Sequence, residues 1–149
     1  MKIRIIAVGK LKEKRLSEVI NEYINRIKYD AKLEIIEVKD SNVEEEGKKI
    51  EQAIETIKVP KYVFILSEEG SQFDSIRFSE KIKQLSADNR TIVFVIGGPF
   101  GILPEVKVRA DFLLSLSKMT FTHEMCRLFL LEQIYRAASI IKKRNYHKD

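Results

Sequence analysis

The feature that most constrains the fold is a regular alternation of short apolar segments with longer amphipathic ones. Five segments are rich in β-branched residues and short enough to be buried strands: residues 3–8, 33–38, 62–66, 91–96 and 112–116. The segments between and after them carry apolar residues at helical spacing, which predicts helices over residues 11–28, 43–58, 75–85, 103–108 and 124–143. This alternation predicts an α/β fold, with a mostly parallel sheet and helices on both of its faces.

Nothing in the sequence divides this pattern into separate units. The chain has 149 residues, which is the size of one domain, and it contains no linker, internal repeat or low-complexity stretch. We therefore expect a single domain over residues 1–149. The net charge of +5 permits an anionic partner such as RNA without requiring one.

Composition also excludes several classes of protein. The single cysteine, Cys126, allows no internal disulfide, which fits a reducing cytoplasm. No run approaches the length of a membrane span, and the first residues are too strand-like for a signal peptide. We therefore expect no membrane partner. His123 and His147 are the only histidines and lie far apart in the sequence, so we also expect no metal site.

The glycine-rich turn of this chain comes unusually late. Dinucleotide-binding folds place such a turn after the first strand, whereas here Gly97, Gly98 and Gly101 follow the fourth predicted strand, around Pro99. The phosphate-binding patterns G-x-G-x-x-G and G-x-x-x-x-G-K-[ST] are both absent, which excludes P-loop chemistry. Glycines alone leave two interpretations open, a tight turn or a ligand pocket.

The fifth predicted strand ends in residues 116–121, which combine small hydroxyls, one lysine and large apolar groups. Two neighbouring strand ends with permissive backbone are typical of a small-molecule pocket in an open α/β sheet. A hydrolase is not supported, because no G-x-S-x-G motif is present and Cys126, within the last predicted helix, is best interpreted as a small buried thiol.

The last helix and tail carry the other polar candidates. Glu132 and Arg136 lie four residues apart on a helix, which is also the spacing of a simple surface ion pair. His123 is also consistent with a mere helix start, and Tyr146 and His147 lie in a terminus, where residues are commonly disordered. Residues 118–149 hold seven Lys and Arg against three Asp and Glu, so we expect this segment to contact RNA phosphates.

Taken together, several motifs resemble the ribosomal RNA large subunit methyltransferase H family, a group of small SPOUT-class enzymes. They are Ile-Gly-Gly-Pro-Phe-Gly at 96–101, Ser-Leu-Ser-Lys-Met-Thr-Phe at 115–121, His123, Arg127, Glu-Gln-Ile-Tyr-Arg-Ala at 132–137, Tyr-His-Lys at 146–148 and the opening at 7–12. The resemblance covers essentially the whole chain. Thr122 replaces a common proline, Cys126 replaces an apolar residue and Phe100 occupies a variable position. The missing proline is expected to loosen the loop at 121–123.

The resemblance implies a C-terminal trefoil knot, which periodicity does not predict and general topology rules disfavour. It also implies that knotted loops bind S-adenosyl-L-methionine. This cofactor carries no phosphate and needs an apolar slot with backbone groups. By the same resemblance, the residues that line its pocket are Leu66, Gly97, Gly98, Leu116, Ser117, Lys118, Met119, Thr120 and Phe121.

The implied reaction is methylation of N3 of a pseudouridine in large-subunit (23S) rRNA on the assembled ribosome. Homodimers of this family build each active site from both subunits. Because N3 must lose its proton before it attacks, a base or a stabilising cation is required. The candidates are His147, Tyr146, Arg136, Glu132 and His123, with His147 preferred as base because unperturbed histidine has a pKa of about 6.5. Two alternatives stay open: a non-catalytic ribosome- or RNA-binding module, and a SPOUT enzyme acting on tRNA.

Overall fold

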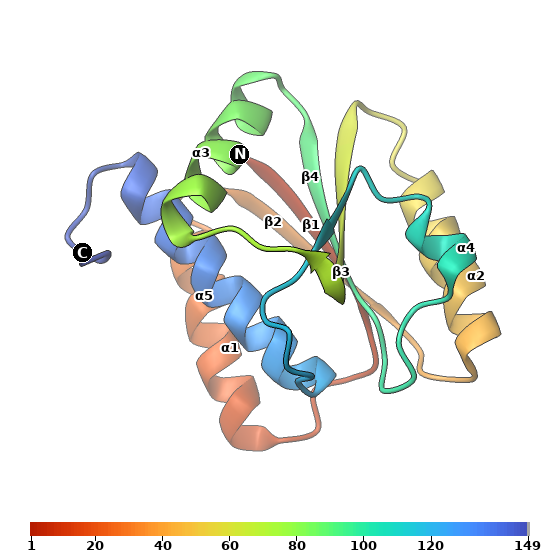
Figure 1. The fold of residues 1–149 in the computed structure, drawn as a ribbon. Coiled ribbons are helices and arrows are strands. Elements are labelled where there is room, and N and C mark those ends of the chain that lie inside the picture. Colours follow the sequence, from red (N-terminus) through yellow and green to blue (C-terminus); the bar gives the residue numbers. More distant parts are fainter. Residues whose placement is uncertain (149) are drawn as a thin grey trace.

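A computed structural model describes residues 1–148, in which five parallel strands form one sheet with helices on both faces (Figure 1). The elements, in chain order, are β1 Lys2–Val8, α1 Lys14–Ile27, β2 Lys32–Val38, α2 Val43–Glu55, β3 Lys61–Ser71, α3 Ser75–Ala87, β4 Thr91–Ile96, α4 Pro104–Lys107, β5 Phe112–Leu114 and α5 His123–Ile141. The strand order is β2-β1-β4-β3-β5, and every neighbouring pair is parallel. The predicted α/β class is confirmed.

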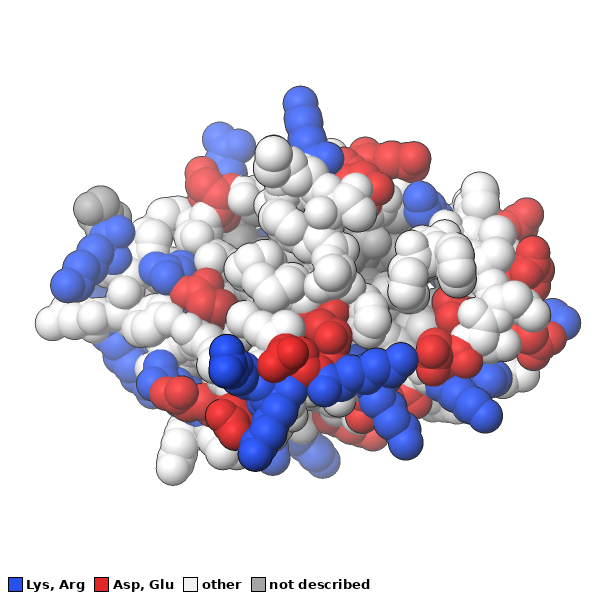
Figure 2. Space-filling view, turned by 90° about the horizontal axis from the view of Figure 1, so that it is seen from below, with Lys and Arg blue, Asp and Glu red and all other residues white. Residues whose placement is uncertain are grey.

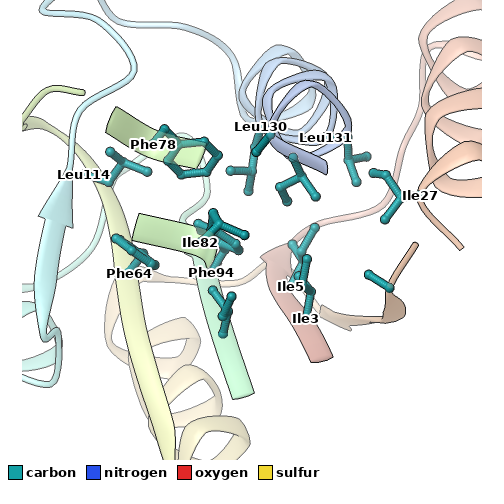
Figure 3. Close-up of a cluster of buried hydrophobic side chains, with 14 of the residues drawn as sticks. Ile3, Ile5, Ile27, Phe64, Phe78, Ile82, Phe94, Leu114, Leu130 and Leu131 are labelled. Carbon is teal, nitrogen blue, oxygen red and sulfur yellow. The ribbon is translucent and has the colours of Figure 1, made fainter. Parts of the chain in front are cut away.

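The sheet is buried on both faces, which explains why its strands are almost continuously apolar. Helices α1, α3 and α5 cover one face, and α2 and α4 cover the other (Figure 1). Figure 3 shows the larger core, where Phe64 and Phe94 of the central strands stack at 5.0 Å beneath Phe78 and Ile82 of α3 and Leu130 of α5. Each such buried side chain stabilises the fold by about 1.5–3 kcal/mol.

Strand β3 is longer than the sequence predicts. The prediction ended it at residue 66 because residues 67–70 read as a polar turn, whereas the structure continues the strand to Ser71. The reason is a second pairing with β5: both Leu66 and Ser71 lie opposite Leu114 across a register shift, and Ser115 donates its N–H to the Ser71 carbonyl at 2.9 Å. The extension crosses β5 so closely that only glycine fits at Gly70, where a Cβ would lie 2.4 Å from the Leu113 carbonyl oxygen.

Smaller boundary differences have local causes. The predicted fifth strand, residues 112–116, pairs only as far as Leu114. Helix α1 starts at Lys14 rather than 11, because the Glu13 side chain accepts the Arg15 N–H as its N-cap. Helix α5 starts at His123, and the Thr122 hydroxyl caps it by accepting the Met125 N–H at 3.3 Å. Thr122 thus anchors the start of this helix.

Within residues 1–148, no helix is both long enough and apolar enough to cross a membrane.

Candidate functional site

A cavity of about 610 Å³ opens at the carboxyl ends of β3, β4 and β5. Its walls come from residues 66–69 of β3, from 96–102 at and after the end of β4, and from most of residues 114–123, with Cys126, at and after the end of β5. Figure 2 looks onto this end of the sheet and shows a hollowed, mostly uncharged centre bordered by basic and acidic side chains. Parallel sheets bind small ligands at this edge, and the volume is that of a typical ligand pocket.

The structure brings most of the predicted cofactor residues together around this cavity. The lining includes Leu66, Gly97, Gly98, Leu116, Ser117, Met119, Thr120 and Phe121. Lys118 is the exception, since it is exposed and does not line the cavity. The sequence did not single out Ile102 or Lys107, which also border the cavity; Ile102 precedes α4 and Lys107 is its last residue.

The glycine-rich loop is both a tight turn and a pocket wall, so both interpretations of it hold. Gly101 has a φ of +77° and donates its N–H back to the Gly98 carbonyl at 3.0 Å. At Gly97 a Cβ would lie 2.6 Å from the Ile102 side chain, so glycine lets the loop fold closely against itself. The loop is narrow because these residues have no side chains.

The loop after β5 is shaped by its own hydroxyls. The Ser115 hydroxyl donates to the Ser117 carbonyl at 2.9 Å, and the Ser117 hydroxyl accepts the Met119 N–H at 3.0 Å. Cys126 is partly buried, packs against the larger core and also borders the cavity. Burial, helped by the nearby charge of Glu68, raises the pKa of the Cys126 thiol, which therefore stays protonated at neutral pH.

A second group of polar side chains centres on Glu132 of α5. One carboxylate oxygen, Oε1, accepts hydrogen bonds from Arg136 Nε at 3.1 Å and from the Tyr146 hydroxyl at 3.2 Å. Arg136 Nη1 lies 3.2 Å from Nδ1 of His147. The Glu132 and Arg136 side chains are only 19% and 24% exposed, so the pair is partly buried rather than a simple surface ion pair.

The same cluster includes Tyr23 of α1, which sequence reasoning missed. Its hydroxyl lies 3.1 Å from that of Tyr146, and no local motif marks it. Burial raises the pKa of Tyr146 well above its usual range, with smaller contributions from Tyr23 and Glu132. The hydrogen bond to Glu132 raises the pKa of Arg136. Tyr146 therefore remains a hydrogen-bond donor beside a permanent cation.

The C-terminal tail is held against the helices by Asp30, which follows α1. Its carboxylate accepts two hydrogen bonds from Arg144, at 2.7 and 2.8 Å, and one from Lys142 at 2.6 Å. These bonds, chiefly that of Arg144, hold the pKa of Asp30 below its usual value. The Tyr146 ring then packs edge-on against Tyr135, with centroids 4.7 Å apart. Tyr146 and His147 are thus placed by specific contacts.

His123 lies apart from this cluster. It begins α5 and borders the cavity, whereas Glu132 lies about 13 Å farther along the helix axis. Its Nε2 packs against Gly9 and is buried without a hydrogen-bond partner among residues 1–148. The structure therefore divides the predicted catalytic residues between the two regions.

One wall connects those regions. A second cavity of about 500 Å³ lies on the other side of residues 114–121 and is lined by Glu132 together with Phe73 and Phe129. Leu116 and Phe121 line both cavities. In the part of the chain that the structure describes, no three His, Cys, Asp or Glu side chains are grouped to hold a metal ion.

Comparison with known proteins places this architecture in a family. Residues 1–147 match the family model described as "Predicted SPOUT methyltransferase". The chain is 41% identical to ribosomal RNA large subunit methyltransferase H of Acholeplasma laidlawii and 44% identical to that of Alkaliphilus oremlandii, with 99% of this chain and 100% of each relative covered.

A solved structure supports the fold. A probable methylase family protein from Haemophilus influenzae superposes with a TM-score of 0.58 at 14% sequence identity, over 99% of this chain and 70% of that one. The full-length matches in sequence, the five-stranded parallel sheet and the cavity at its carboxyl edge agree. The chain belongs to the ribosomal RNA large subunit methyltransferase H family of SPOUT methyltransferases.

Proposed function

We propose that this chain uses S-adenosyl-L-methionine to methylate N3 of a pseudouridine in large-subunit (23S) rRNA on the assembled ribosome. The observation that carries the proposal is a cavity that fits the cofactor and shares Leu116 and Phe121 with a second cavity, which Glu132 of the polar cluster lines. The names of the full-length relatives support rRNA as the substrate.

The residues around the cavity fit this cofactor. Leu66 and Leu116 offer an apolar slot for adenine, and the loop at 97–101 offers backbone groups without side chains. The carboxylates of Glu68 and Glu69 border the same space and suit a positively charged ligand. Bound there, S-adenosyl-L-methionine would supply an electrophilic methyl group on its sulfonium sulfur.

On the substrate side, this chain must bring the pseudouridine N3 into line and relieve it of its proton. Arg136 stays cationic, because Glu132 raises its pKa, and a fixed cation stabilises the anionic base. Tyr146 stays protonated and donates its one hydroxyl proton to Glu132 beside Arg136. Glu132 accepts from both residues and so orients them.

His147 contacts Arg136 in this arrangement. Arginine can only donate, so Nδ1 of His147 is the acceptor in its hydrogen bond with Arg136. We infer that His147 becomes the proton acceptor, the role that the sequence predicts for it, once Nδ1 leaves Arg136.

The remaining parts of the proposal concern assembly. We infer one domain over residues 1–149 and a cytoplasmic homodimer whose active site takes groups from both subunits. We further infer that the segments after β4 and β5 form the trefoil knot. Family membership supports these inferences, and for the knot so does the meeting of residues 66–69, 96–102 and 114–123 around one cavity.

The proposal is tested with labelled S-adenosyl-L-methionine and ribosomes from a strain that lacks its own methyltransferase of this family. We expect label in large-subunit rRNA and none in a parallel tRNA sample. Calorimetric titration of S-adenosylhomocysteine tests the cofactor site separately, and an absence of binding heat would argue against it. In the His147→Ala variant transfer should collapse while ribosome binding persists; unchanged transfer would exclude His147 from the chemistry.

A further inference from the structure

The basic residues of the C-terminal segment are largely engaged within the protein. Arg127 is buried, pairs with Glu37 at 3.3 Å and donates to the Gly9 carbonyl at 2.9 Å. Arg136 pairs with Glu132, while Lys142 and Arg144 share Asp30. Four of the seven Lys and Arg residues in this segment thus already have acidic partners, which weakens the expectation that the segment supplies most of the contacts to RNA phosphates.

The loop between β1 and α1, taken together with the first two residues of α1, presents the opposite case. Residues 10–15 contain four cations, Lys10, Lys12, Lys14 and Arg15, and all four are exposed. None of them forms an ion pair with any residue in the described part of the chain. Glu13, the one acid among them, uses its carboxylate to cap α1 through the Arg15 N–H at 3.3 Å.

This loop is fixed beside the cavity. The Glu124 carboxylate of α5 accepts the backbone N–H groups of Lys12 and Glu13, and these bonds keep the pKa of Glu124 low, so the hold persists at neutral pH. Gly9, which opens the loop, packs against His123 at the cavity wall and donates its N–H to the Val38 carbonyl. In Figure 1 the loop lies at the same end of the sheet as the start of α5.

We propose that Lys10, Lys12, Lys14 and Arg15 form the docking surface for the phosphate backbone of the RNA substrate, beside the cavity that receives the methyl donor. The proposal rests on the proposed function. A rigid backbone that displays four unpaired cations attracts a polyanion with little loss of internal ion pairs. Because the loop lies next to His123 at the cavity wall, the RNA backbone binds the loop while the target nucleobase enters beside the cavity.

The test compares two quadruple variants with the same change in charge. The loop variant carries Lys10→Gln, Lys12→Gln, Lys14→Gln and Arg15→Gln. The control variant replaces four exposed cations that lie toward the other end of the sheet and lack ion pairs among residues 1–148: Lys32, Lys58, Lys83 and Arg90, each to Gln. Binding to purified ribosomes is measured over a series of salt concentrations, and binding of S-adenosylhomocysteine reports that each variant is folded.

For the loop variant we expect ribosome affinity to fall about tenfold or more at low salt. The slope of log affinity against log salt should become shallower by about 0.7–0.9 for each phosphate that the variant no longer neutralises. The control variant should stay within about threefold of wild type, and all three proteins should bind S-adenosylhomocysteine alike. Equal affinities and slopes for the two variants would overturn the docking surface.

The outcomes separate this inference from the proposed function. If wild type binds ribosomes through the loop but transfers no methyl group, the proposed function fails and the docking surface stands. If the loop variant binds and methylates like the control variant, the docking surface fails and the proposed function stands. A wild-type chain without measurable affinity for ribosomes overturns the docking surface directly.

Discussion

Replacing Gly70 by alanine should damage both the fold and the cofactor site. The extension of β3 crosses β5 at this residue, and a Cβ there would lie 2.4 Å from the Leu113 carbonyl oxygen, 2.6 Å from its carbonyl carbon and 3.0 Å from the Leu114 nitrogen. All three atoms belong to the backbone, so no side chain can rotate to make room. One of the two strands must therefore move.

The size of the effect follows from this geometry. Inserting one carbon into a tightly packed place costs about 1–3 kcal/mol. For a domain of this length, each kcal/mol lowers the melting temperature by about 2–4 °C. Because Ser71 and Ser115 bond across the same crossing, the shift also displaces the loop that lines the cavity. We expect affinity for S-adenosylhomocysteine to fall together with stability.

Thermal unfolding and calorimetric titration of S-adenosylhomocysteine measure the two effects. Ser71→Ala is the matched control, because it lies in the same extension, is exposed, and keeps its backbone bonds. Its stability should change by less than about 0.5 kcal/mol. If Gly70→Ala melts and binds the ligand like Ser71→Ala, the close crossing of β3 and β5 is wrong.

Three further predictions concern side chains of the tail and the cavity. Asp30→Asn should lower the urea midpoint at pH 7 but have little effect at a pH below the lowered pKa of this carboxyl. The ionised carboxylate stabilises the fold fully above its pKa in the unfolded chain, about 3.9, and this stabilisation is lost as the pH falls through its lower pKa in the folded chain. An equal loss of urea midpoint at both pH values would contradict this prediction. Tyr146→Phe should reduce methyl transfer about 100-fold without weakening S-adenosylhomocysteine binding. If the variant instead lost only its affinity for S-adenosylhomocysteine, Tyr146 would belong to the cofactor site and not to the substrate site. Cys126 should react with iodoacetamide more slowly than free cysteine at pH 8, and more slowly again with S-adenosylhomocysteine bound; rapid reaction would mean that its thiol is not shielded.

The sequence predicted those parts of the fold that depend on apolar periodicity. The five strands and the main helices were found because burial on both faces of the sheet demands continuous apolar runs, as in Thr91–Ile96. The β3 extension was missed because its residues are polar and its pairing depends on distant β5. The proposed trefoil knot leaves no periodic signal either, and rests on family likeness.

The candidate site shows the same division. Permissive backbone at two strand ends indicated a small-molecule pocket, whereas the individual cofactor candidates came from the family resemblance. Eight of these nine candidates line the cavity. Lys118 was included by its position in the motif, which does not reveal that its side chain is exposed. Tyr23 and Asp30 could not be found, because each meets the tail only after more than a hundred residues of chain have folded.

The most direct test of the central claim is to locate the methyl group on the RNA. Wild-type protein, S-adenosyl-L-methionine and unmethylated ribosomes are incubated, and the nucleosides and fragments of the large-subunit rRNA are analysed by mass spectrometry. We predict one added methyl group per ribosome, on N3 of a pseudouridine. A methyl group on another base, on tRNA alone, or on no RNA at all would contradict the account.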